Sequence, residues 1–129
     1  MKTLILAALF LGGSSVATYA AAPSAAADVM AGYYGNTVVV TGAALQVKVH
    51  YRADHTLDVA GTRSGQAFST KGVWKIDDKG QICRTYETPP PGLPNPFCTP
   101  AEAHKVGDTW SVPAAGGGTN QDKMVAGVQ

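Results

Sequence analysis

The chain has 129 residues, of which 45% are hydrophobic and 15% are charged, and its formal net charge at pH 7 is +1. This length fits one domain. A charge so close to zero argues against nucleic acid, another polyanion or an anionic membrane as the main partner, because these need a surplus of basic residues.

The first 20 residues have the layout of a secretory signal peptide. A positive charge at Lys2 is followed by an apolar stretch from Leu4 to Leu11 and then by small residues. Cleavage fits after Ala17 or Ala20, and we prefer Ala20. The apolar stretch is much shorter than the roughly 20 residues that a membrane-spanning helix needs, so we expect an exported protein without a membrane span.

Removal of residues 1–20 leaves a single domain of residues 21–129, which we expect in a bacterial periplasm or outside the cell. Lys2 leaves with the leader, so the 10 Lys and Arg residues become 9 and balance the 9 Asp and Glu residues. A chain this short buries only about two-thirds of its unfolded surface, so a covalent cross-link would be a useful supplement to its core.

The N-terminal half predicts one short helix followed by strands. Residues 24–35 can form two helical turns, with Ser24 as N-cap and a glycine ending the helix. Residues 37–42 form a β-branched run closed by glycine, and residues 45–61 alternate polar and apolar on either side of a polar turn. This alternation predicts a hairpin with an inward face of Leu45, Val47, Val49 and Tyr51.

A second hairpin is predicted over residues 67–87. A strand over residues 67–76 leads into the turn "DDKG" at residues 77–80 and a returning strand over residues 81–87. Trp74 and Ile76 share a face in this arrangement, and we expect both in the core.

The C-terminal part predicts a further hairpin within residues 102–112, turning at residues 106–108. A flexible segment over residues 114–121 and a last strand over residues 123–128 follow. The total is seven or eight short antiparallel strands, which favours a mostly β fold, a small barrel or a sandwich.

The order of these segments resembles small exported bacterial β-barrel proteins of lipocalin-like or calycin-like build. The resemblance is carried by the leader, "YYGNTV", "VHYRADHTLDVAG", "KGVWKIDDKGQIC", a second cysteine and "GDTWSV". In such proteins a Gly-x-Trp strand precedes a "DxxGxxC" hairpin and a disulfide-tied loop. The resemblance implies a small antiparallel lipocalin-like barrel and carries no catalytic residue onto this chain.

Both cysteines flank a proline-rich segment, "RTYETPPPGLPNPF". In an exported chain Cys83 and Cys98 predict a disulfide, and they match neither a zinc site nor a C-x-x-C redox motif. The prolines keep this loop out of a sheet. The loop is either a structural crossover or a pre-organised recognition loop, as in an inhibitor, with Leu93 or Phe97 as apolar anchor.

Aromatic side chains are the second lead to a function. An open barrel can hold a small apolar ligand, although small barrels are also commonly filled by their own side chains. We therefore expect non-enzymatic binding of a small apolar molecule in the cell envelope, without a cofactor, or else binding of an envelope protein through the loop. The candidate ligand-binding residues are Tyr34, Tyr51, Phe68, Trp74 and Trp110.

The densest polar cluster offers only a weak alternative. His50, Asp54 and His55 could hold a divalent metal, but the last two lie in a predicted turn, where such side chains commonly bond their own backbone. The chain contains no G-x-S-x-G elbow and no phosphate-binding glycine loop. A metal-dependent or hydrolytic enzyme is therefore the least favoured interpretation.

Overall fold

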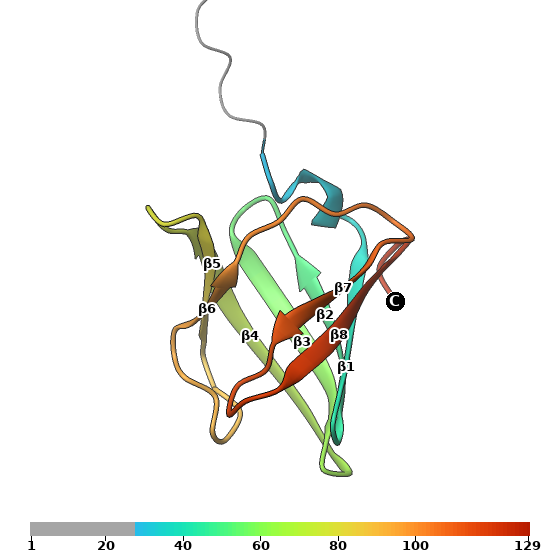
Figure 1. Cartoon of the computed structure of the whole chain (residues 1–129), viewed down its shortest axis with the longest axis vertical. Helices are drawn as coiled ribbons and strands as arrows, with labels where there is room; N and C mark the ends of the chain where they lie inside the picture. The colour runs from blue at the N-terminus through green and yellow to red at the C-terminus, as the bar shows by residue number, and fades with distance from the viewer. Residues whose placement is uncertain (1–27) are drawn as a thin grey trace, which may run out of the picture.

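The structure is a computed structural model that describes residues 28–129, so the leader and the start of the expected helix lie outside the described residues. Eight antiparallel strands form one sheet in the order β6-β5-β4-β3-β2-β1-β8-β7, which curls into a nearly closed barrel (Figure 1). This confirms the expected small antiparallel barrel. The strands are β1 (Thr37–Gly42), β2 (Leu45–Tyr51), β3 (Thr56–Arg63), β4 (Gln66–Ile76), β5 (Gln81–Tyr86), β6 (Phe97–Pro100), β7 (Thr109–Pro113) and β8 (Thr119–Val125).

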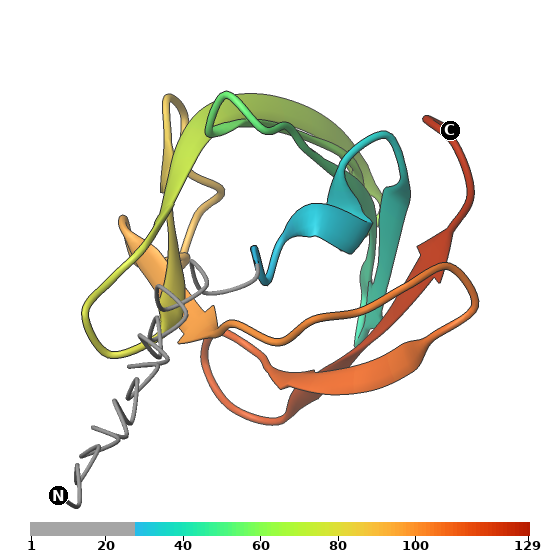
Figure 2. The same ribbon diagram turned by 90° about the horizontal axis from the view of Figure 1, so that it is seen from above.

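One end of the barrel, here called the closed end, is covered by the short 3-10 turn η1 (Ala31–Tyr33). Figure 2 shows η1 lying across the ring of strands. In the part of the chain that the structure describes, this turn stands where the two-turn helix was expected. Glycine is a poor helix former, and Gly35 adopts a φ of 73° that ends the turn. No helix within residues 28–129 is long and apolar enough to cross a membrane.

The alternation predicted for the first hairpin is confirmed, with one error in the second. Val47, Val49 and Tyr51 are buried in β2, and Trp74 is buried in β4. Ile76, however, is 38% exposed. It is the last residue of β4, beside the turn to β5, where fewer neighbours cover a side chain than in the middle of a strand.

The C-terminal hairpin differs from the one expected. β7 pairs with β8 instead of with residues 102–105, which belong to the connection that crosses the closed end between β6 and β7. The glycine-rich segment forms the turn of this hairpin, with the amide of Ala114 donating to the carbonyl of Gly118 at 3.0 Å. The last strand therefore begins at Thr119, four residues before the predicted Lys123.

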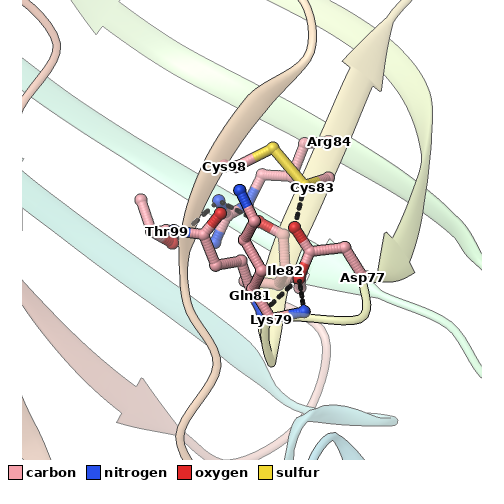
Figure 3. The surroundings of a disulfide bond; sticks show 8 residues. All are labelled: Asp77, Lys79, Gln81, Ile82, Cys83, Arg84, Cys98 and Thr99. Carbon is pink, nitrogen blue, oxygen red and sulfur yellow. Dashed lines mark hydrogen bonds between the residues drawn. A yellow bond between two sulfur atoms is a disulfide. The ribbon is translucent and has the colours of Figure 1, made fainter.

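The expected disulfide between Cys83 and Cys98 is present (Figure 3). The two residues lie directly opposite each other in the β5–β6 ladder, with their Cα atoms 4.0 Å apart. β6 has only four residues and lies at the edge of the sheet. The disulfide thus fixes a short edge strand that has few backbone hydrogen bonds of its own.

The proline loop between the cysteines is tied to β5 by one side chain. Asn95 accepts a hydrogen bond from the amide of Tyr86 at 2.9 Å and donates one to its carbonyl at 3.2 Å. The amide side chain thereby replaces the strand partner that the prolines cannot provide. Leu93 and Phe97 are half-buried and pack against the core.

We predict that replacing both cysteines, Cys83→Ala with Cys98→Ala, lowers the free energy of unfolding by about 3 kcal/mol, the loop-closure entropy of a cross-link across this separation. Urea unfolding of the double variant and of the oxidised wild-type chain measures this. An unchanged free energy of unfolding would contradict a stabilising role for the disulfide.

We predict a loss of about 1–3 kcal/mol for Asn95→Ala, because Tyr86 is buried and its backbone amide and carbonyl lose their partners. Thermal and urea unfolding provide the measurement. Asn95→Asp is the matched variant: it retains the acceptor and loses the donor, so its loss should be smaller. Equal stability of all three proteins would show that the pairing contributes nothing.

Candidate functional site

The barrel interior contains a cavity of about 350 Å³. Its lining includes the β1–β2 and β7–β8 turns, which lie at the end of the barrel opposite η1 (Figure 1), here called the open end. For scale, an engineered apolar cavity of about 150 Å³ already binds benzene, and ligand pockets begin at about 300 Å³. The mouth lies between the β1–β2 turn, the β7–β8 turn and the proline loop. Most of the residues that line it are apolar, among them Val40, Leu45, Val47, Val59, Phe68, Leu93 and Phe97, and polar groups also contribute to its surface.

A smaller cavity of about 70 Å³ lies beneath the closed end. Its wall includes Tyr33 from η1 together with His104 and Trp110. Three polar side chains, Tyr51, Arg84 and Asp122, line both cavities. These three therefore form the polar boundary between the two spaces, and we call them the polar girdle.

Arg84 enters the interior from β5, on the same face as the buried Ile82 and Tyr86. Its Nε donates to the hydroxyl of Tyr51 at 2.6 Å, and its Nη1 donates to Thr99 Oγ1 at 3.1 Å. The guanidinium also lies 5.7 Å from the ring centres of Tyr51 and Phe97, within cation–π distance. Arginine stays charged in proteins, so a permanent positive charge is held inside the barrel.

Asp122 enters the interior from β8 and is 8% exposed. Its Oδ1 is buried and has no hydrogen-bond partner among residues 28–129. Burial raises the pKa of this carboxyl group to about 6, and the positive charge of Arg84 opposes that rise. The two groups do not form an ion pair, since the pairs within residues 28–129 join Arg52 to Asp58 and His104 to Glu102 and Asp108.

The closed end is packed by aromatic side chains. The His104 ring stacks on Trp110 with ring centres 3.6 Å apart, and Tyr33 meets Tyr51 edge-on at 5.5 Å. The Tyr33 hydroxyl donates to the carbonyl of Glu102 at 2.9 Å, and burial raises the pKa of this phenol. The space beneath this end is only about 70 Å³, so the larger cavity at the open end is the candidate site for a ligand.

The structure separates the ligand-binding candidates into two groups. Tyr51 and Phe68 line the larger cavity, and Tyr51 and Trp110 line the smaller one. Tyr34 and Trp74 line neither of these cavities: they stack on each other, and the Trp74 indole donates to the carbonyl of Arg52 at 3.1 Å. The loop candidates Leu93 and Phe97 both line the larger cavity.

The three weak metal candidates are not brought together. His50 Nε2 contacts the hydroxyl of Thr37 at 3.1 Å, and the His55 ring stacks on Trp74. Asp54 accepts bonds from the hydroxyl and amide of Thr56, which lower its pKa. Among residues 28–129 no cluster of three potential metal ligands occurs. Asp54 thus stabilises its own turn, which is the commoner role of such a residue.

Arg84 and Asp122 were not among the sequence candidates. Period-two alternation through Ile82, Arg84 and Tyr86 already places Arg84 on an inward face, which is a detectable signal. Asp122 carried no such signal, because the last strand was expected to begin one residue after it. In the structure β8 begins at Thr119, so Asp122 belongs to the strand and points to the same face as the buried Met124, two residues further on.

We predict that Asp122→Asn raises the free energy of unfolding at pH 8. Folding raises the pKa of Asp122 from 3.8 to about 6, so the folded state holds this proton more tightly and the group costs stability above pH 6. The cost is about 3 kcal/mol above pH 6 and disappears as the pH falls to about 4.

Urea unfolding of wild type and variant across this pH range measures the difference. Asp78→Asn is the control, because Asp78 is an exposed turn residue. A stability difference that does not change with pH would contradict a raised pKa at Asp122.

Comparisons with known proteins give no external guide to this site. No family model, no curated protein and no solved structure matches the chain.

Proposed function

We propose that the chain is a non-enzymatic binding protein for a small, largely apolar ligand, which occupies the larger cavity of the barrel. The observation that carries this proposal is the volume of about 350 Å³ behind a mouth, lined mostly by apolar residues. A small barrel that binds no ligand would be more stable if its own side chains filled this space, because close packing stabilises a fold and cavities cost free energy.

The site of action that we propose is the periplasm or the outside of the cell. Two features support it: the leader-like segment at residues 1–20 and the disulfide between Cys83 and Cys98. Disulfides persist in oxidising compartments and are rare in the cytosol. An apolar ligand that is poorly soluble in the aqueous envelope is a suitable cargo for an enclosed cavity.

The alternative is a protein-interaction module that acts through the loop at residues 83–98. The disulfide and the prolines pre-organise this loop, which reduces the entropy cost of binding. Against it, the two candidate anchors Leu93 and Phe97 pack against the core and line the cavity. The loop therefore contributes its apolar side chains to the cavity wall, and we favour the small ligand.

A cavity-filling substitution tests the proposal. Val59→Phe places extra atoms into the larger cavity from its wall, and we expect it to weaken or abolish binding of linear alcohols from butanol to dodecanol. Isothermal titration calorimetry and ligand-induced thermal shifts provide the measurement. In wild type we expect affinity to rise with chain length until the cavity is full, because each buried methylene contributes about 0.8 kcal/mol.

The matched control is Val73→Phe, since Val73 is 54% exposed and lies outside the cavity. This variant should bind the same alcohols as wild type does. No binding of any alcohol to wild type, or equal binding by Val59→Phe and wild type, would refute the proposed site. Leu93→Ala should change alcohol affinity if the loop serves the cavity, and should leave it unchanged if the loop serves only a protein partner.

A further inference from the structure

The guanidinium of Arg84 retains one nitrogen for another partner. Nε and Nη1 are engaged by Tyr51, Thr99 and the carbonyl of Ile82, whereas Nη2 makes no hydrogen bond within residues 28–129. Because Arg84 lines both cavities, this free donor group belongs to the boundary between them.

Asp122, at the same boundary, has a hydrogen-bond acceptor that lacks a donor. Its Oδ1 is a buried acceptor without a donor among residues 28–129. Its Oδ2 takes part in no hydrogen bond among these residues either, and the residue lines both cavities. Buried polar atoms nearly always have a partner, so a lone one calls for an explanation. A donor and an acceptor therefore lie unpaired in one polar girdle, with no ion pair between them to satisfy either group.

We propose that the ligand carries a neutral polar head of the primary amide type, which accepts a hydrogen bond from Arg84 and donates one to Asp122. This inference rests on the proposed function and specifies its ligand class. A primary amide has both a carbonyl acceptor and N–H donors, so a single head group can satisfy both residues.

Charge selects this head group over its relatives. A carboxylate would match Arg84 but would face the Asp122 carboxylate, and an ammonium group would match Asp122 but would face the guanidinium. Either ion would be desolvated next to a like charge, which is costly in a buried site. A neutral amide adds no charge to a girdle in which one positive and one negative group already balance.

The position of the girdle sets the direction of the ligand. Arg84 and Asp122 lie at the inner limit of the larger cavity, next to the small cavity under the closed end. The apolar wall extends from there to the mouth, along residues such as Val47, Val59 and Leu45. The head therefore enters first, and the apolar tail extends toward the proline loop.

Octanamide and octanoate, which share a chain length and differ in head-group charge, test this inference by calorimetry at pH 8. We expect wild type to bind octanamide about tenfold or more tightly than octanoate, the effect of leaving buried polar groups unpaired or opposed. Asp122→Asn removes the opposing charge, so octanoate affinity should rise about tenfold or more and the preference should be lost or reversed.

Asp78→Asn is again the control, because it removes a carboxylate from an exposed turn and should retain the wild-type preference. Arg84→Met removes the hydrogen-bond donor, so its affinity for octanamide should be lower than that of wild type. If Arg84→Met does not fold, Asp122→Asn still decides the test. Equal binding of octanamide and octanoate by wild type overturns this inference and leaves the cavity function standing. No binding of either compound, or of any alcohol, overturns both.

Discussion

The interior of this barrel is organised by a positive charge that cannot be neutralised by deprotonation. Arg84 extends from β5 and is held by Tyr51 of β2 and Thr99 of β6, so one guanidinium connects three strands. A buried guanidinium needs such acceptors, because an unsatisfied charge in a protein interior is very costly. Its bulk and its partners divide the interior into a packed closed end and a hollow open end.

The two ends illustrate how a small chain can combine stability with an empty space. Aromatic stacking and η1 pack the closed end and leave only a small cavity of about 70 Å³ beneath it. A cavity at the open end and an unpaired carboxylate in the polar girdle both reduce stability, and the disulfide acts in the opposite direction. Cys98 anchors the edge strand from which Phe97 reaches the cavity wall. The cross-link thus holds in place a short edge strand that contributes a side chain to the cavity wall.

Local chemistry predicted much of the fold. β-branched alternation in Leu45–Tyr51, the Asp-rich turn at residues 77–80 and the cysteine pair each depend on nearest neighbours along the chain or on a single covalent bond. The predictions were wrong where contacts between residues far apart in the sequence determine the structure. Residues 102–105 do not form a strand because β8 is the partner of β7. Ile76 is partly exposed at the end of β4, beside the turn to β5. Alternation in the sequence places Arg84 on an inward face, whereas Asp122 was missed because the last strand was expected to begin after it. That the two share one space depends on the curling of the whole sheet, since their strands are far apart in sequence.

The proposed ligand class depends on Asp122 being a buried carboxylate that lines the cavity and lacks a partner among residues 28–129. The most direct measurement is a carbon-13 NMR titration of its side-chain carboxyl in the ligand-free protein. We predict a midpoint near pH 6, as burial requires. A midpoint at or below the ordinary aspartate value of 3.8 would mean that the carboxylate is hydrated or paired, and it would contradict the polar girdle as described.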